Sequence, residues 1–367
     1  MPCYHPVDMY RWLTSSGDYE YTHCPVIGSK RGAQKTSRAC GYCVGCRLEK
    51  SAEWAVRVMH EASLYWHNCW ITLTLNDEYL FSDFRNQNPY SVDHKDYNKY
   101  PWNSSSLQRG ERSEISKFLK RLRNKYGEGI RYYYCAEYGE TCFTCDLNEQ
   151  TCKEKGCGNY IAWRGRPHYH ICLFNHDFSD KELYKYINGQ PHYSSKELDA
   201  LWTDPDTGLW MGFATVSDLT VDSAAYTARY TMKKIYGHAL KNDDLVTGVK
   251  HYERISYDGE IVPLIPEYTN MSRGSSKLKT GGIGKGWLEK YNKEVLDNDA
   301  VLFKNFRMKP PRYYDNWLSD LHPLLHEENK QKRIDKADSS PDNTPERLAT
   351  REYIVKQKTE KLYRKEC

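Results

Sequence analysis

The chain has 367 residues, of which 39% are hydrophobic and 28% charged, so it can bury one large core or two modest ones and is not disordered. The formal net charge is only +4, which excludes a polycation and leaves contacts with nucleic acid to local basic clusters. No apolar run approaches the roughly 18 residues of a membrane-spanning helix, and the amino terminus lacks the apolar segment of a signal peptide. We therefore expect a cytosolic protein with no membrane partner.

Thirteen cysteines are many for a chain without an export signal, and in a reducing compartment clustered cysteines indicate metal ligands rather than disulfides. The first cluster is Cys40-Gly-Tyr-Cys43-Val-Gly-Cys46, where intervening glycines let backbone amides turn toward the sulfurs. Cys24 would complete a tetrahedral site of four thiolates, for which zinc is the preferred ion. The same spacing occurs in iron–sulfur ferredoxins, so an iron–sulfur cluster and plain buried cysteines remain alternatives.

A helix and a strand are predicted after this cluster. Hydrophobic residues recur at three- and four-residue steps from position 48 to 66, with charged residues between them, as in a surface helix. Residues 69–75 alternate with period two, which predicts a strand with Thr72 and Thr74 on one face. Residues 76–110 are polar and predict a long surface loop that could touch DNA, although nothing in their sequence indicates it.

Residues 113–126 predict a strongly amphipathic helix, because its hydrophobic residues fall on one face. The other sides of this helix carry Lys117, Lys120, Arg121, Arg123 and Lys125. A solvated basic face and a phosphate-contacting surface are equally good interpretations of these residues.

The strand predicted over residues 131–139 carries Glu137 near its end. Glu137 is a candidate metal ligand, because we expect this strand to pair antiparallel with the strand over residues 167–174; the alternative is a solvated carboxylate. Between the two strands, four further cysteines predict a zinc-stabilised hairpin extension, since so short an insert cannot bury a core of its own. They are Cys142, Cys145, Cys152 and Cys157.

His168 and His170 flank one residue within the run Pro-His-Tyr-His-Ile-Cys-Leu-Phe, which predicts a buried strand. Side chains of a strand alternate between its faces, so both imidazoles project the same way. Two neutral imidazoles on a rigid strand supply half of a divalent-metal site if a carboxylate or third histidine approaches from a neighbouring strand. The alternative is that one histidine is a satisfied polar residue at the strand end and the other faces solvent.

Two helical pieces, split near residues 188–191, are predicted within residues 180–202, followed by an edge strand over residues 212–219. A helix is then predicted over residues 222–237, with Asp222 or Ser223 as its cap and Gly237 closing it.

The helix over residues 222–237 places Tyr226, Tyr230 and Lys234 on one face, because positions four apart lie together. A phenol becomes a useful nucleophile when a metal or cation polarises an electrophile such as a phosphodiester. The alternative is an amphipathic helix that packs its aromatic face on a sheet. Because the chain has 31 tyrosines, a single tyrosine would not by itself indicate a nucleophile.

The carboxy-terminal third contains the glycine-rich segment Gly281-Gly-Ile-Gly-Lys-Gly286. It fails the Walker pattern, because Lys279 stands where the first glycine belongs and Gly286 where a serine or threonine must bind Mg2+. We therefore predict no ATPase or helicase activity in this chain. From Lys330 onward the sequence is charged and poor in apolar residues, which predicts a solvated helix or a mobile tail.

Together, His168-Tyr169-His170 and Tyr226-x-x-x-Tyr230-x-x-x-Lys234 resemble the signature of the HUH endonucleases, which initiate rolling-circle replication. Longer blocks resemble, more narrowly, the initiators of gokushovirus-type microviruses, which are small single-stranded DNA phages. These blocks are residues 40–57, 69–75, 137–139, 267–273 and 281–291. The four-cysteine insert departs from the family pattern, which commonly has a short turn there.

The predicted order of strands and helices is that of a ferredoxin-like split arrangement, an α+β fold with an antiparallel sheet and helices on one face. The resemblance implies the same core, here with an amino-terminal cysteine knuckle and a zinc-hairpin insert. The expected domains are a knuckle and helix (1–68), an HUH endonuclease core (69–237, with the insert 142–157), an accessory region (238–310) and a charged helical or mobile tail (311–367).

The resemblance also implies an activity. His168, His170 and Glu137 would bind Mg2+ or Mn2+, and Tyr226 or Tyr230 would attack a phosphodiester at an origin, leaving a 5′-phosphotyrosine and a free 3′-hydroxyl. Lys234, and with it Lys233, would steady the phosphate or help to deprotonate the phenol. The expected partners are single-stranded origin DNA and the host polymerase and helicase, in the host bacterial cytoplasm. Two alternatives remain: a single-tyrosine HUH relaxase or transposase, and a non-catalytic zinc-knuckle protein that binds nucleic acid.

Overall fold

The computed structural model of the chain forms two compact units, Met1–Ala52 with Leu318–Cys367, and Glu53–Trp317. The structure describes residues 3–17, 19–76, 107, 109–111, 113–139, 151, 166–229, 250, 252–255, 261–276, 280–303 and 306–363.

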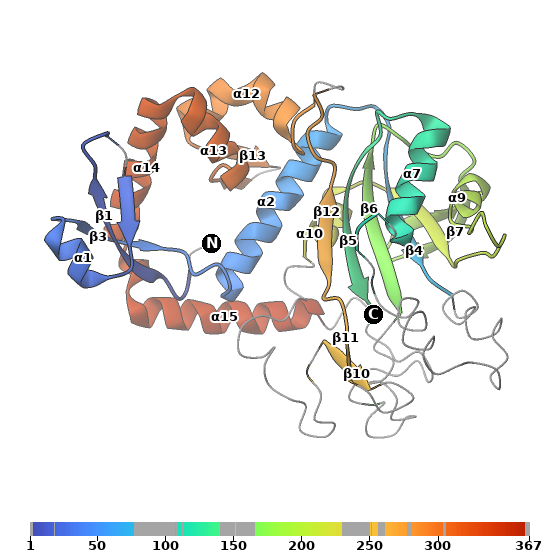
Figure 1. Ribbon diagram of the computed structural model, residues 1–367, viewed down its shortest axis with the longest axis horizontal. Coiled ribbons are helices and arrows are strands. Elements are labelled where there is room, and N and C mark those ends of the chain that lie inside the picture. Colours follow the sequence, from blue (N-terminus) through green and yellow to red (C-terminus); the bar gives the residue numbers. More distant parts are fainter. Residues whose placement is uncertain are drawn as a thin grey trace. The chain divides into compact units, whose positions relative to one another are not determined.

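The larger unit is built on a seven-stranded antiparallel sheet, which confirms the predicted α+β class and antiparallel sheet (Figure 1). Its strand order is β12-β5-β6-β4-β9-β8-β7. In chain order the strands are β4 (Asn68–Thr74), β5 (Arg131–Tyr138), β6 (Pro167–Phe174), β7 (Glu182–Ile187), β8 (Gln190–Ser194), β9 (Ala214–Asp218) and β12 (Tyr268–Met271). The predicted strands at 69–75, 131–139 and 167–174 are therefore confirmed within a residue or two.

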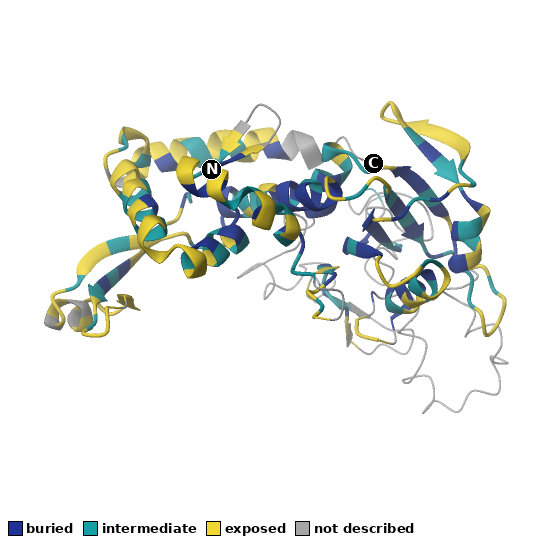
Figure 2. Ribbon diagram, turned by 90° about the horizontal axis from the view of Figure 1, so that it is seen from above, coloured by how far each residue is buried: buried dark blue, intermediate teal, exposed yellow. Residues whose placement is uncertain are grey.

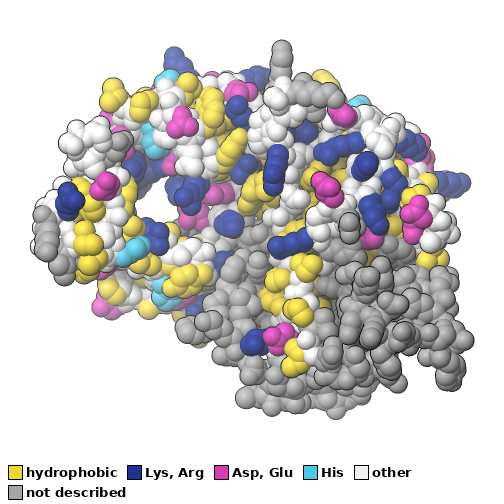
Figure 3. Space-filling model, viewed as in Figure 1, with side chains coloured by type: hydrophobic (Ala, Val, Ile, Leu, Met, Phe, Trp, Pro, Cys, Tyr) yellow, Lys and Arg dark blue, Asp and Glu magenta, His cyan; other side chains and the backbone are white. Residues whose placement is uncertain are grey.

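One face of the sheet is covered by α7 (Glu114–Tyr126) and α9 (Lys196–Leu201). α7 begins as predicted, with the Ser113 hydroxyl accepting a hydrogen bond from the Ser116 amide, and it buries Phe118 and Leu122 against Ile71 of β4. This packing leaves Lys117, Lys120 and Lys125 exposed, and Figure 3 shows lysine and arginine gathered where α7 lies. Arg121 and Arg123 are half-buried and donate hydrogen bonds to backbone carbonyls.

The opposite face is covered by α2 (Val44–Ala62), which begins in the smaller unit, and by α10 (Val221–Ala228). The prediction that helices cover one face only is therefore wrong. Tyr133 of β5 and Phe174 of β6 give this second face an apolar patch that must be covered, and Val58 of α2 and Ala224 of α10 pack there. Figure 2 shows that buried residues are frequent along the strands of the sheet.

Residues 182–194 form a hairpin of β7 and β8, so the predicted first helical piece of residues 180–202 is wrong, whereas α9 confirms the second. The cause is the Asn188-Gly189 pair, whose φ angles of 49° and 77° are those of a tight turn that suits the twist of a hairpin. β9 was predicted as an edge strand, but it lies inside the sheet between β4 and β8. The new hairpin supplies the edge.

The glycine-rich segment leads into α12 (Lys285–Asn298) and is held by side chains of the larger unit. The buried Glu61 carboxylate accepts a hydrogen bond from the Gly284 amide (2.7 Å) and forms an ion pair with the buried Arg131 (2.7 Å). The Arg57 guanidinium donates two hydrogen bonds to the Ile283 carbonyl (3.0 Å each). The segment thus serves as a fixed joint between α2, β5 and α12.

Three shorter pieces complete the larger unit. They are the hairpin of β10 (Glu253–Ile255) and β11 (Ile261–Pro263), the hairpin of β13 (Val301–Phe303) and β14 (Phe306–Met308), and α13 (Arg312–Leu321), whose last residues belong to the smaller unit.

The smaller unit combines both ends of the chain. Its sheet has the order β2-β1-β3, with β1 (Val7–Leu13), β2 (Tyr19–Thr22) and β3 (Gln34–Arg38), and α1 (Pro25–Lys30) joins the last two strands. The charged segment after Lys330 is helical, within α14 (Pro323–Asp338) and α15 (Pro345–Tyr363). The short turn η2 (Pro341–Asn343) separates these two helices. None of the helices in the described parts of the chain has the length and apolar character needed to cross a bilayer.

Replacing Glu61 tests the joint. Glu61→Ala leaves the Arg131 guanidinium buried without its partner, so the free energy of unfolding should fall by about 3 to 5 kcal/mol in a urea titration followed by tryptophan fluorescence. The matched control is Glu289→Ala, which removes a surface ion pair with Lys285 and should cost less than about 0.5 kcal/mol. Equal losses in both variants would contradict the role of the buried pair.

The buried His60 makes the stability of the larger unit depend on pH. Burial against Trp287 lowers the pKa of His60 to about 3, whereas an unfolded histidine has its pKa near 6.5. At pH values between about 3 and 6.5, His60 is protonated in the unfolded chain but not in the folded chain. The free energy of unfolding therefore falls as the pH drops below about 6.5, by roughly 2 kcal/mol at pH 5. Urea titrations from pH 7 to 5 should show a shallower loss for His60→Gln. Identical slopes would refute the assignment.

Candidate functional site

The site lies where β5 and β6 pair, at the second and third positions in the strand order of the sheet. The two strands are antiparallel, as predicted, and their register places Glu137 directly opposite His168. His170 lies two positions further along β6 and therefore on the same face. The ligand atoms of Glu137, His168 and His170 all lie within 4.8 Å of one another, so the structure brings together the three predicted ligands of the catalytic metal.

Two imidazoles and a phenol of the site lie around one carboxylate oxygen of Glu137. Glu137 Oε1 lies 3.3 Å from His168 Nε2 and 3.1 Å from His170 Nε2. The Tyr226 hydroxyl donates a hydrogen bond to the same oxygen at 3.3 Å. Glu137 is only 1% exposed, whereas the His168 side chain keeps 16% of its surface accessible. A ligand would therefore approach from the His168 side.

The hydrogen bonds of His168 show why this arrangement suits a cation. His168 Nδ1 lies 3.0 Å from the Arg166 carbonyl, which can only accept, so the ring proton belongs on Nδ1. In neutral His168 the lone pair of Nε2 then faces a Glu137 oxygen that also carries lone pairs. Two acceptors 3.3 Å apart need a proton or a cation between them. Nitrogen and oxygen donors held in this way fit a divalent metal ion.

His170 is oriented by two residues of β4. The Thr72 hydroxyl lies 3.0 Å from His170 Nδ1, which directs Nε2 toward Glu137. The Trp70 indole stacks on the His170 ring, with centroids 5.0 Å apart and planes 3° from parallel. The Trp70 N–H in turn donates to the Thr227 hydroxyl of α10 (2.9 Å). β4 therefore links the strand that carries the two histidines to the helix that carries Tyr226.

Tyr226 lies in the last turn of α10, and its ring meets the His170 ring edge-on, with centroids 4.8 Å apart. The helix cap differs from the prediction, because Thr220 rather than Asp222 or Ser223 is the N-cap residue. Thr220 and Ser223 satisfy each other's backbone amides as a capping box. The described part of the helix ends at Ala228, and the predicted site residues Tyr230, Lys233 and Lys234 lie outside the described residues.

The amino-terminal cysteines form a second group, and its composition corrects the sequence prediction. The sulfurs of Cys40, Cys43 and Cys46 gather with that of Cys3. Cys24, predicted as the fourth ligand, is exposed between β2 and α1 and is not part of the group, because that turn faces solvent. The predicted zinc ligands of the insert, Cys142, Cys145, Cys152 and Cys157, lie outside the described residues.

Sequence reasoning missed Cys3, Trp70 and the orienting role of Thr72. For Trp70 and Thr72 a signal existed, because period-two alternation puts both on the face of β4 that meets the histidines once β4 pairs with β6. For Cys3 there was none beyond its identity as a cysteine.

The chain is similar to replication-associated proteins of phages over most of its length. It is 32% identical over 289 residues to ORF2 of Spiroplasma virus 4, a match that covers 75% of this chain and 66% of that protein. VP4 of Bdellovibrio phage phiMH2K is 28% identical over 325 residues, with 88% and 79% covered. ORF4 of Chlamydia phage 1 is 22% identical over 291 residues, with 77% and 53% covered. No family model matches the chain, and no solved structure matches it significantly.

The Thr72 hydroxyl offers a test of the metal site that leaves all three ligands in place. Thr72→Val keeps the shape of the side chain but removes the bond to His170, and loss of such an orienting partner typically weakens metal binding by about 10- to 100-fold. Isothermal titration with Mn2+ measures the effect. The control is Thr74→Val, on the same face of β4 but with no side-chain hydrogen bond to any described residue, which should bind like the wild type. Unchanged affinity in Thr72→Val would refute the orienting role.

Proposed function

Because the chain belongs to the family of replication-associated proteins of small single-stranded DNA phages, we propose that it nicks and rejoins DNA at a phage origin and thereby starts rolling-circle replication. In this proposal the enzyme is a metal-dependent endonuclease and strand transferase of the HUH class. Its core comprises the central strands of the seven-stranded sheet with α7 and α10 on its two faces.

The observation that supports this function best is the convergence of Tyr226, His168 and His170 on Glu137 Oε1. A phenol beside two imidazoles and a carboxylate combines a nucleophile with the donors of a divalent-metal site. A purely structural cluster would not need the phenol. A packing tyrosine would not need the buried carboxylate.

Glu137, His168 and His170 would hold Mg2+ or Mn2+, whose contribution is to withdraw electron density from the scissile phosphate and offset its developing charge. The chain itself has three tasks. Trp70 and the edge of the His170 ring hold the Tyr226 ring in place. The Glu137 carboxylate orients the phenol by accepting its hydrogen bond. The buried sheet and α10 exclude water from one side of the site.

The proposed reaction is a transesterification. The Tyr226 oxygen forms a bond to phosphorus while the bond from phosphorus to the 3′-oxygen breaks. The phenol loses its proton and the leaving 3′-oxygen gains one, so the products are a 5′-phosphotyrosine and a free 3′-hydroxyl. The energy of the cleaved bond is kept in the covalent link, which allows religation without ATP. A polymerase of the host can extend the free 3′-end.

Tyr230, Lys233 and Lys234 complete the proposal from the sequence. A second tyrosine one helical turn beyond Tyr226 would allow a second cleavage while the first adduct persists, as release of a unit-length circle requires. A lysine would steady the phosphate or help to deprotonate the phenol. The partners in this proposal are single-stranded origin DNA and the host polymerase and helicase, in the host cytoplasm.

A covalent-adduct assay tests the function. The full-length protein is incubated with Mn2+ and labelled single-stranded oligonucleotides that tile the phage genome, and adducts are detected on denaturing gels. One oligonucleotide should be cleaved and attached to the wild type, with the adduct mapped to Tyr226 or Tyr230 by mass spectrometry. Tyr226→Phe/Tyr230→Phe should form no adduct, because both nucleophiles are removed.

The matched control is Tyr186→Phe, an exposed tyrosine of β7, which should react like the wild type. Each single variant, Tyr226→Phe and Tyr230→Phe, should retain some adduct on the other tyrosine. Complete loss in one single variant would instead indicate a single-tyrosine enzyme. If no oligonucleotide is cut by the wild type with Mn2+ or Mg2+, the proposed nicking activity is refuted.

A further inference from the structure

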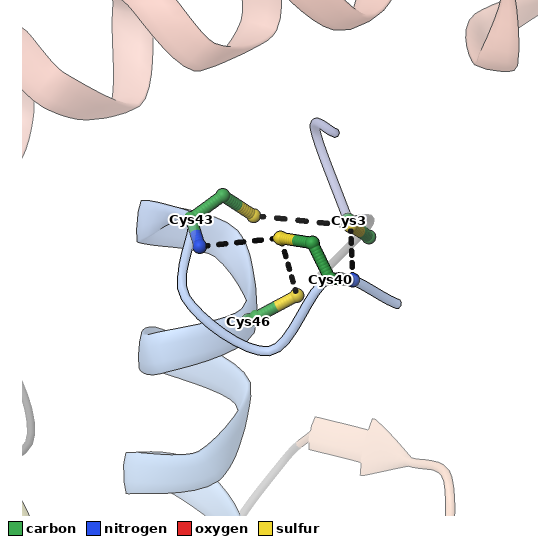
Figure 4. Close-up of side chains that lie close together, drawn as sticks. All are labelled: Cys3, Cys40, Cys43 and Cys46. Carbon is green, nitrogen blue, oxygen red and sulfur yellow. Dashed lines mark hydrogen bonds between the residues drawn. The ribbon is translucent and has the colours of Figure 1, made fainter. Parts of the chain in front are cut away.

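Four cysteine sulfurs from distant parts of the smaller unit surround one point (Figure 4). Cys40 Sγ lies 3.9 Å from Cys46 Sγ, and Cys43 Sγ lies 3.9 Å from Cys3 Sγ. A disulfide needs sulfurs about 2.05 Å apart, so neither pair is bonded. Zinc–sulfur bonds of about 2.3 Å place the corners of a tetrahedron about 3.8 Å apart, which matches the observed separations.

The same spacing argues against a cluster of several irons. The thiolates of such a cluster are divided among its irons, so those on different irons are held apart by the cluster, whereas these four sulfur atoms all lie within 4.8 Å of one another and leave room for a single ion. Soft sulfur donors in a tetrahedral set select zinc among the common divalent ions, with a single iron as the rival.

Backbone amides complete the surroundings of the sulfurs. The Cys43 amide donates to Cys40 Sγ (3.3 Å), the Cys40 amide to Cys3 Sγ (3.2 Å) and the Tyr4 amide to Cys43 Sγ (3.4 Å). Such bonds disperse the negative charge that four thiolates bring to a site. Two of these bonds involve residues 3 and 4, so the segment before β1 is part of the site rather than a loose end.

We propose that Cys3, Cys40, Cys43 and Cys46 bind one structural Zn2+, and that this ion fastens α15 to the amino-terminal part of the chain. The proposal is independent of the nicking activity, because none of these residues belongs to the site around Glu137.

The packing around the cysteines explains why an ion is needed. The hydrophobic cluster here has four buried residues, Tyr4, Cys43, Cys46 and Leu348, and two of them are zinc ligands in the proposal. Leu348 belongs to α15, and next to it the Glu352 carboxylate pairs with His5 (2.9 Å). Among the described side chains of α15, Leu348 and Thr359 alone are buried. So small a core holds a long helix weakly unless the segment it packs on is fixed by a metal.

Metal analysis of two serine variants tests the ligand set. The full-length wild type, Cys3→Ser and Cys24→Ser are purified without chelator, and bound zinc and iron are measured by inductively coupled plasma mass spectrometry. Cys3→Ser should contain one zinc fewer per chain than the wild type, and Cys24→Ser should contain as much. The difference between variants is the readout, so zinc bound elsewhere in the chain does not affect it. If Cys3→Ser folds poorly, Cys3→His serves as the second variant. It keeps a metal-binding side chain and should therefore retain the zinc.

Hydrogen–deuterium exchange of the same proteins tests the fastening of α15. In Cys3→Ser, peptides from residues 345–359 should exchange faster than in the wild type, while peptides from α7 should be unchanged, because α7 belongs to the larger unit. Zinc loss in Cys24→Ser but not in Cys3→Ser, or iron in place of zinc, would overturn the assignment of the site. Unchanged exchange of residues 345–359 in zinc-free Cys3→Ser would overturn the role of the ion in holding α15.

Discussion

The pairing register of β5 and β6 is the constraint on which the candidate site depends. A slip of one residue would turn every side chain of one strand to the other face of the sheet. Glu137 would then leave the histidines and enter the apolar layer beneath α7. The register is held on that other face by the buried residues Tyr134, Ala136, Tyr169 and Ile171. The hydrophobic core on one face of the sheet therefore sets the geometry of the polar site on the other face.

The face of the sheet that carries the site has an apolar region and a polar region, and both affect how the site would bind a cation. Toward α2 it is apolar, around Tyr133 and Phe174, and toward the strand ends at Glu137 and His168 it becomes polar and partly accessible. The Trp70 ring lies between the two regions, stacked on His170 and bonded to Thr227. Near apolar surroundings, the attraction between a cation and the Glu137 carboxylate is stronger than in water. The accessible edge at His168 still leaves a route for a large substrate.

The sequence allowed prediction of those parts of the site that follow from local periodicity. His168 and His170 share a face because strands alternate, and Glu137 follows once β5 and β6 are taken to pair. Contacts between residues that lie far apart in the sequence could not be predicted from it. Cys3 replaces Cys24 because the segment before β1 returns to the start of α2, which no spacing rule encodes. The hairpin of β7 and β8 is a different failure, because Asn188-Gly189 is a strong turn signal and the prediction treats it as a break between two helices.

The two groups of ligands differ in number and hardness, and these differences indicate different roles. Three nitrogen and oxygen donors leave coordination positions open for water or substrate, as a reactive ion requires, and such donors suit Mg2+ or Mn2+. Four thiolates close a tetrahedron and leave no position for a substrate. An ion at the cysteines can therefore hold the chain together but has no place to bind a phosphate. By donor count alone, the DNA chemistry that we propose for this protein belongs to the sheet of the larger unit.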